Sequence, residues 1–299
     1  MSQSETSSRR MGLWLLLGSA APLIHYSGGG YMTAFLASAA ILPLNLLFRD
    51  GFSRLGKAVS FLEWLWITLV LAAMLPAAAT YWPGEKSKVV VPLVLLVLAA
   101  VSGEKQQTSR GVSTLFWLGF PLLAAILFLG TGSIRAEFLK PVCGVWPAEL
   151  TAALLLPTVM GILQPIRRRK TVQVLGLGGL CIWAAVVFQG VLGAIPAMTV
   201  DSPYFELGKS MGKGNYEMIA SVAATLGWYG FCTLLHQSGV QLGMRWGLRN
   251  RVAGILTAAA AGAWILLGLY PEGRILTAGC VLLWVLVPVL SSKNKNEKR

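Results

Sequence analysis

Long apolar segments alternate with short polar segments along nearly the whole chain. The segment 58–82, for example, holds Glu63 as its one charged residue. A helix needs about 20 apolar residues to cross a hydrocarbon core of roughly 30 Å, and several segments reach that length. The pattern predicts about ten membrane-spanning helices, over the ranges 11–27, 30–48, 58–82, 88–102, 111–130, 147–164, 171–195, 215–237, 252–269 and 275–290.

Composition indicates the same class of protein. Of the 299 residues, 55% are hydrophobic and 12% are charged, whereas an ordinary soluble domain has about 25% charged residues. Such a chain has too little polar surface to cover itself in water. We therefore expect an all-α membrane protein, integral and multi-pass, whose main solvent is the lipid bilayer.

The positive charge indicates orientation and does not indicate nucleic-acid binding. The net charge is +13, and its lysines and arginines sit in short loops and at the termini. Basic loops mark the cytoplasmic face of a membrane protein and attract anionic lipid headgroups. We expect both termini in the cytoplasm, with a tail at 1–10, one transmembrane domain at 11–290 and a basic tail at 291–299.

The two halves of the chain share one irregular feature. The first and sixth predicted spans each carry a proline near the middle, Pro22 and Pro157. A proline frees backbone groups, and at membrane depth these are tolerated only against protein or a water-filled cavity. Paired breaks in corresponding spans are typical of a transporter's binding site. With five spans in each half, the second repeat (about 147–290) must be inverted relative to the first (about 11–131).

The predicted substrate site lies at these two breaks. Half-helix N-termini there can meet a ligand carboxylate, and exposed carbonyls can meet its ammonium group or a coupling ion. The alternative is that each proline merely kinks a packed helix. The residues assigned to the site are Gly18, Ser19, Ala20, Pro22, Leu156, Pro157 and Thr158.

Three acidic residues and two tryptophans are further candidates. Glu63 lies within the third span, and an ionisable group at membrane depth is a functional candidate by default; Glu149 and Glu217 begin the sixth and eighth spans. Each could couple or gate transport, or it could pair with a basic loop or cap its helix. Trp66 and Trp228, on the third and eighth spans, could form the walls of a ligand pocket or could pack against neighbouring helices without contacting a ligand.

Several function classes receive no support. The four cysteines form no CxxC or Cys/His spacing, so no metal site, cofactor or disulfide framework is indicated. His236, at the inner end of the eighth span, is typical of a hydrogen-bonded structural histidine. A membrane-embedded enzyme needs a nucleophile–base pair or clustered acids, and the sequence has no such pattern, so we expect no enzymatic activity.

Four stretches of sequence carry a resemblance to a known family. They are Gly103-Glu104 followed by Arg110; Glu149 to Leu156-Pro157 followed by Arg167 to Lys170; Asp201 to Lys209, with Pro203 and Leu207; and Tyr216-Glu217 followed by Trp228. This pattern resembles the amino acid–polyamine–organocation superfamily, and within it the spore-germination permeases, the polytopic subunits of endospore germinant receptors.

The resemblance implies a fold and a function. It implies the LeuT-type five-plus-five inverted repeat, with an amino-acid-like ligand held by broken first and sixth helices between the third and eighth helices. It also implies partner receptor subunits and a location in the bacterial cytoplasmic membrane or the spore inner membrane. The alternative is a non-transporting sensor or scaffold subunit with the same permease fold.

Overall fold

The computed structural model describes twelve stretches of the chain, and all twelve are built from helices and their connections. These stretches are residues 37, 39–40, 57–82, 87–104, 121–139, 153–154, 158, 171–193, 203–212, 215–269, 274–283 and 285. No strand occurs among the described residues. The labelled helices are α3 (Lys57–Met74), η3 (Leu75–Tyr81), α4 (Ser87–Glu104), η4 (Ala136–Leu139), α7 (Thr171–Leu192), α9 (Pro203–Ser210), α10 (Tyr216–Arg245) and α11 (Asn250–Leu266). Two further apolar helices span Pro121–Thr131 and Arg274–Leu283.

The predicted third, fourth, seventh, eighth and ninth spans each correspond to a helix in the structure. Two helices are long and apolar enough to cross a membrane, Ser60–Tyr81 and Tyr216–Arg245. The first and second spans, and most of the sixth, lie outside the described residues. The count of ten and the inverted repeat are therefore not established by the described part of the chain.

Two boundaries differ from the prediction. The eighth span was predicted to end at residue 237, but α10 continues to Arg245. The polar residues of this extension lower its hydropathy, yet its small residues pack closely on α11. The predicted outer loop around Pro203 is instead a short helix, α9, which begins at that proline. Its Tyr204 and Leu207, three residues apart on one face, are fully buried.

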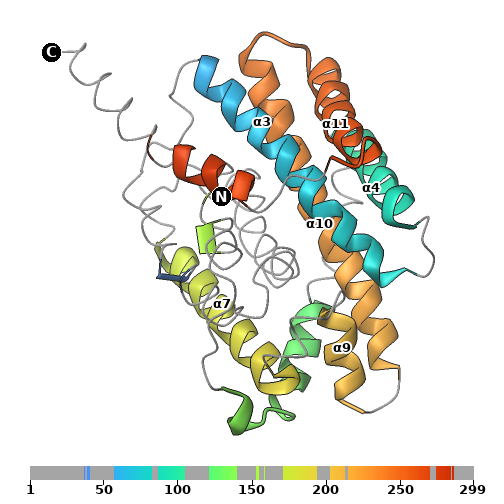
Figure 1. Cartoon of the computed structure of the whole chain (residues 1–299), viewed down its shortest axis with the longest axis vertical. Coiled ribbons are helices and arrows are strands. Elements are labelled where there is room, and N and C mark those ends of the chain that lie inside the picture. The colour runs from blue at the N-terminus through green and yellow to red at the C-terminus, as the bar shows by residue number, and fades with distance from the viewer. Residues whose placement is uncertain are drawn as a thin grey trace, which may run out of the picture.

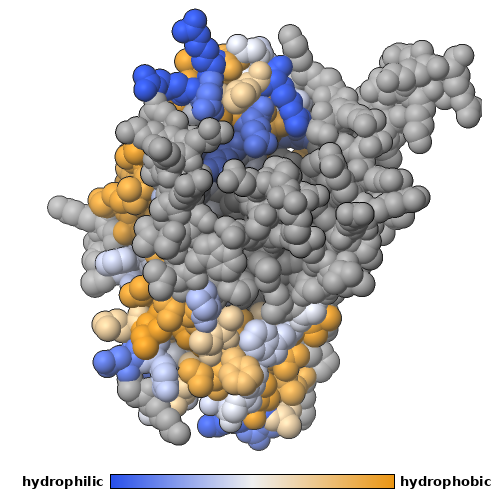
Figure 2. All heavy atoms as spheres, turned by 180° about the vertical axis from the view of Figure 1, so that it is seen from behind, coloured by the Kyte–Doolittle hydropathy of each residue, from blue (hydrophilic) through white to orange (hydrophobic). Residues whose placement is uncertain are grey.

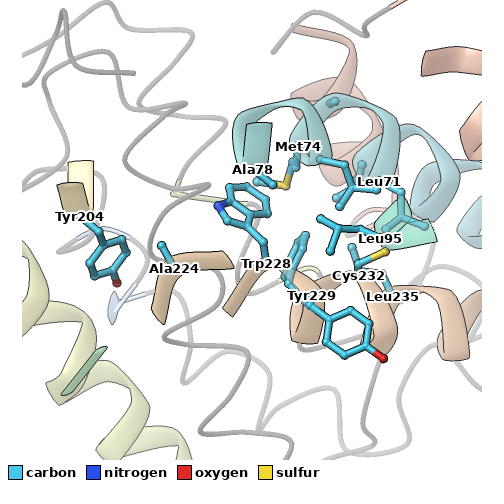
Figure 3. Packing of buried hydrophobic residues seen from close by; sticks show 14 of the residues in the cluster. Leu71, Met74, Ala78, Leu95, Tyr204, Ala224, Trp228, Tyr229, Cys232 and Leu235 are labelled. Atoms are coloured by element: carbon cyan, nitrogen blue, oxygen red, sulfur yellow. The ribbon is translucent and has the colours of Figure 1, made fainter. Parts of the chain in front are cut away.

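Helices α3, α4, α10 and α11 form one packed group that makes up about half of the described structure. Helix α10 contacts α3, α4 and α11, while α11 also contacts α3 and α4. Helices α3 and α10 run in opposite directions beside each other (Figure 1). Figure 3 shows the core between them, where the Trp228 indole of α10 lies close to Met74 and Ala78. At the other end of the molecule, α9 packs on α10 and α7.

On α11, several large side chains face outward and small ones face inward. In α11, Ile255, Leu256 and Leu266 are exposed, whereas Ala253 and Thr257 are buried. Small inward residues let membrane helices approach closely, because lipid gives no reason to bury the large ones. Figure 2 shows hydrophilic residues at the top of the molecule and again near its bottom, with hydrophobic residues along the side between them. The exposed side of α4 is a continuous apolar stripe of Val90, Val94, Val97, Leu98 and Val101.

Two glycines four residues apart bring α10 against α11. A Cβ atom at Gly239 would lie 2.6 Å from the Cγ2 atom of Thr257, and one at Gly243 would lie 2.8 Å from the Cβ atom of Ala253. Neither position has room for a larger residue. This is the small-residue spacing by which membrane helices pack without a hydrophobic driving force between them.

We expect Gly239→Ala to destabilise the folded protein by about 1–3 kcal/mol, because overpacking forces neighbouring groups apart. The measurement is the thermal unfolding midpoint of the detergent-purified protein. The matched control is Gly262→Ala on α11, where the nearest atom to a new Cβ would be Leu93 Cδ2 at 3.6 Å. The control should be neutral or stabilising by up to about 1 kcal/mol, because alanine favours a helix over glycine. Equal effects of both substitutions would contradict the packing described for α10 and α11.

Candidate functional site

Some of the predicted site residues lie outside the described residues, and the others fall in three places. Those outside are Gly18, Ser19, Ala20, Pro22, Glu149, Leu156 and Pro157. Those described are Glu63, Trp66, Thr158, Glu217 and Trp228.

Trp66 and Thr158 come together around one cysteine. The Cys280 thiol, on the helix Arg274–Leu283, lies within hydrogen-bonding range of the side chains of both Thr158 and Trp66. The Trp66 indole also donates a hydrogen bond to the carbonyl oxygen of Leu276, with an Nε1–O distance of 3.4 Å. Trp66, Thr158 and Cys280 are all buried. The third predicted span, the sixth and the tenth therefore meet at this point.

A glycine makes this meeting possible. A Cβ atom at Gly279 would lie against the Trp66 ring, 2.9 Å from its Nε1 atom and closer still to Cδ1. The indole thus occupies the space that any other residue at this position would need. The Thr158 hydroxyl donates a hydrogen bond to the carbonyl oxygen of Leu154 at 2.7 Å, one helical turn earlier.

Glu63 lies one turn from Trp66 on α3. Residues three apart in a helix are neighbours on its surface, so the carboxyl group and the indole share a side of α3. Glu63 is 1% exposed, and its Oε1 atom has no hydrogen-bond partner. No described residue forms an ion pair with Glu63. Arg245, exposed at the end of α10, is the positive charge that acts on this carboxyl group electrostatically.

Beside Glu63, polar and aromatic contacts join α3 to α10 and α11. The Trp64 indole donates a hydrogen bond to the Thr257 hydroxyl at 3.0 Å, and that hydroxyl donates to the Ala253 carbonyl oxygen at 2.8 Å. The Trp64 ring also meets the Trp246 ring edge-on, with centroids 5.4 Å apart. Phe61 packs on both of these rings. These contacts fix the segment of α3 that carries Glu63.

Trp228 does not join this group. It lies beside Met74 and Ala78 (Figure 3), and Met74 is eight residues beyond Trp66, or about 12 Å along a helix axis. It meets the Phe231 ring edge-on, with centroids 6.0 Å apart. Trp66 and Trp228 therefore lie at different levels along α3, and their role in a ligand pocket stays a prediction. Glu217 is exposed in the first turn of α10, at the end of the bundle opposite Glu63.

His236 makes the structural contact that the sequence predicted, and one of its ring nitrogens has no hydrogen-bond partner. Its Nε2 atom lies 2.9 Å from the Gly254 carbonyl oxygen on α11. A carbonyl oxygen can only accept, so Nε2 donates, and in the neutral ring Nδ1 is then an acceptor. His236 is buried, and its Nδ1 atom has no hydrogen-bond partner.

Glu63 and, one turn along α3, the contact of Trp66 with Thr158 and Cys280 carry the chemistry of a cation or ammonium site. A buried carboxyl oxygen without a partner costs free energy unless a ligand or proton satisfies it. An indole face attracts cations, and a hydroxyl can orient a bound polar group. Among the described residues, no group of His, Cys, Asp or Glu could hold a metal ion. The small run Thr277 to Cys280 in an otherwise bulky apolar span was the sequence signal for the part of this site that we did not predict.

No protein-family model and no curated protein matches this chain. The resemblance to the spore-germination permeases therefore stays a prediction based on the residues quoted for it.

We expect Glu63→Met to raise the stability of the solute-free protein by about 1–3 kcal/mol, because it removes a buried polar group that has no partner. The thermal unfolding midpoint in detergent measures this. The control, Glu217→Gln, changes an exposed carboxylate in a first helical turn and should cost at most about 1 kcal/mol. A loss of about 3 kcal/mol or more for Glu63→Met would instead indicate a broken buried ion pair.

Proposed function

We propose that this chain is a multi-pass integral membrane permease that binds a small amino-acid-like solute, with Glu63 as its coupling or gating carboxylate. One observation carries the proposal. Glu63 is buried, with an unpartnered oxygen, within the helix Ser60–Tyr81, which is long and apolar enough to cross a membrane. Glu63 lies near the start of this helix, and an acidic residue buried within a membrane-crossing helix is expensive and marks a substrate or ion pathway.

The arrangement of the helices supports a two-fold repeat. In a five-plus-five repeat, the third span corresponds to the eighth and the fourth to the ninth. These spans contain α3 with η3, α10, α4 and α11, and every two of the four spans are in contact, with α4 meeting the third span at η3. In such a repeat, α3 corresponds to α10 and α11 corresponds to α4. The contact between α3 and α11 therefore has a counterpart between α10 and α4, and both contacts exist. The opposite directions of α3 and α10 (Figure 1) agree with an inverted second half.

Surface and charge support a membrane location. Bulky apolar side chains are exposed on α4 and α11, and monomeric soluble proteins rarely expose such extensive patches. At the end where α10 meets α11, Arg245, Arg249 and Arg251 are exposed. Basic residues in a short loop favour the cytoplasmic side. We assign this end and both termini to the cytoplasm, in a bacterial cytoplasmic or spore inner membrane.

The ligand class follows from the site's chemistry. The unpartnered Glu63 oxygen suits an ammonium group or a coupling proton, and the Trp66 ring adds cation–π attraction. A ligand carboxylate would meet the backbone at the first and sixth helix breaks, at Gly18 to Pro22 and Leu156 to Thr158. The germination role and the partner receptor subunits rest on the family resemblance alone.

The test is uptake of radiolabelled amino acids into proteoliposomes, preceded by a thermal-shift screen to find the ligand. A ligand at a hundredfold excess over its dissociation constant adds about 2.7 kcal/mol of stability. We expect Glu63→Gln to lower uptake at least about tenfold, since a lost charge-assisted contact is worth 1.4 kcal/mol or more. Glu137→Gln, which changes an exposed carboxylate on η4, is the control and should retain uptake.

Three other outcomes would change the proposal. Binding without accumulation of solute would replace transport by the sensor function. Equal uptake by wild type and Glu63→Gln would remove Glu63 from the mechanism. Ligand binding that survives both Thr158→Val and Trp66→Phe would move the site away from the group around Cys280.

A further inference from the structure

A cavity lies on the opposite side of α10 and α11 from the Glu63 group, and the proposed function does not use it. Its volume is about 370 Å³, enough for about a dozen waters at ~30 Å³ each. It lies between the end of α4, the second half of α10 and the start of α11. The lining residues are Ala100, Val101, His236, Val240, Asn250, Arg251, Gly254 and Ile255.

The walls of this cavity are apolar and continue onto the outer surface. Val101 of α4 and Ile255 of α11 line the cavity and are 59% and 61% exposed. Each belongs to an outward apolar side of its helix, one formed by Val97 and Val101 and the other by Ile255 and Leu256. The cavity therefore opens toward the surface that we assign to lipid, and a ligand can enter it sideways from the bilayer.

The polar groups of the cavity lie at its inner end and at its base. Arg251 and Asn250, both exposed, begin α11, and none of the eight lining residues is acidic. Arg249 and Arg245 add positive charge nearby on the same connection. At the base, buried His236 lines the cavity and keeps a partnerless Nδ1 acceptor, because Nε2 is held by Gly254.

We propose that this cavity binds the headgroup of an anionic glycerophospholipid, of the phosphatidylglycerol type, from the cytoplasmic leaflet. Arg251 meets the phosphate, since guanidinium groups form strong charge-assisted hydrogen bonds to phosphate oxygens. The acyl chains run over the exposed residues of α4 and α11. Basic pockets between helices at the cytoplasmic side suit such lipids. A free phosphate would leave the apolar walls uncovered. The inference rests on the proposed membrane location but not on transport.

The test is native mass spectrometry of the detergent-purified full chain with added phosphatidylglycerol or phosphatidylcholine. We expect retained phosphatidylglycerol and at least about tenfold weaker binding of phosphatidylcholine. Arg251→Gln should weaken phosphatidylglycerol binding about tenfold, whereas Arg249→Gln, which removes the same charge from the same connection but does not line the cavity, should change it less than about threefold.

A second variant blocks the cavity without touching a charge. Val101→Trp places a large ring at its exposed wall and should also abolish selective retention, while the unfolding midpoint shows that the protein remains folded. Equal losses for the two arginine variants would overturn the proposal in favour of diffuse attraction between the basic loop and anionic lipid. Stabilisation by inorganic phosphate or glycerol 1-phosphate equal to that by the lipid would overturn the lipid assignment.

Uptake is measured in parallel with Arg251→Gln and Glu63→Gln. Loss of lipid binding with uptake intact, or the reverse, separates this inference from the proposed function.

Discussion

The close approach of α10 to α11 and α3 is the constraint on which the described structure depends. Gly239 and Gly243 place the α10 backbone against Thr257 and Ala253 of α11, and this brings Thr257 within reach of the Trp64 indole on α3. The bulky residues displaced from these contacts face outward. This arrangement suits apolar surroundings, because in water the exposed valines, leucines and isoleucines would be the groups to bury.

Glu63 lowers the stability of the folded protein locally, and its neighbours keep it in its buried position. A carboxyl group that is buried and lacks a partner for one oxygen lowers stability, and nothing in the packing of Trp64, Trp246 or Trp66 compensates for it directly. Neighbouring contacts instead hold the segment rigidly, so the group cannot turn away to a more polar environment. Such a residue is retained where binding or proton exchange uses the unsatisfied oxygen. The same physical logic applies to His236, whose second nitrogen faces no protein partner.

Hydropathy predicted the existence of most described helices, because lipid-facing and core positions are both apolar and the segments are long. It could not predict which face is buried, since α4, α7 and α10 are apolar on every side, and only the positions of small residues carry that information. The last two turns of α10 were not predicted because their residues are polar, and α9 was too short to distinguish from a loop. Glu63, Trp66 and Thr158 were each predicted from the sequence, but the meeting of Trp66 and Thr158 at Cys280 joins three segments that lie far apart in the sequence. The sequence also could not predict that Trp66 and Trp228 lie at different levels along α3, because position along a helix axis is set by packing.

The most direct measurement of the central claim is the side of the membrane on which the two ends of the bundle lie. Single cysteines replacing Lys209 on α9 and Arg249 between α10 and α11, in a chain without its native cysteines, can be labelled in intact cells with a maleimide that does not cross membranes. Both positions are exposed, and they lie at opposite ends of α10. The account predicts labelling at position 209 in intact cells and at position 249 only after the membrane is permeabilised. Equal labelling of both positions in intact cells, or labelling of both only after permeabilisation, would contradict a bundle that spans the bilayer.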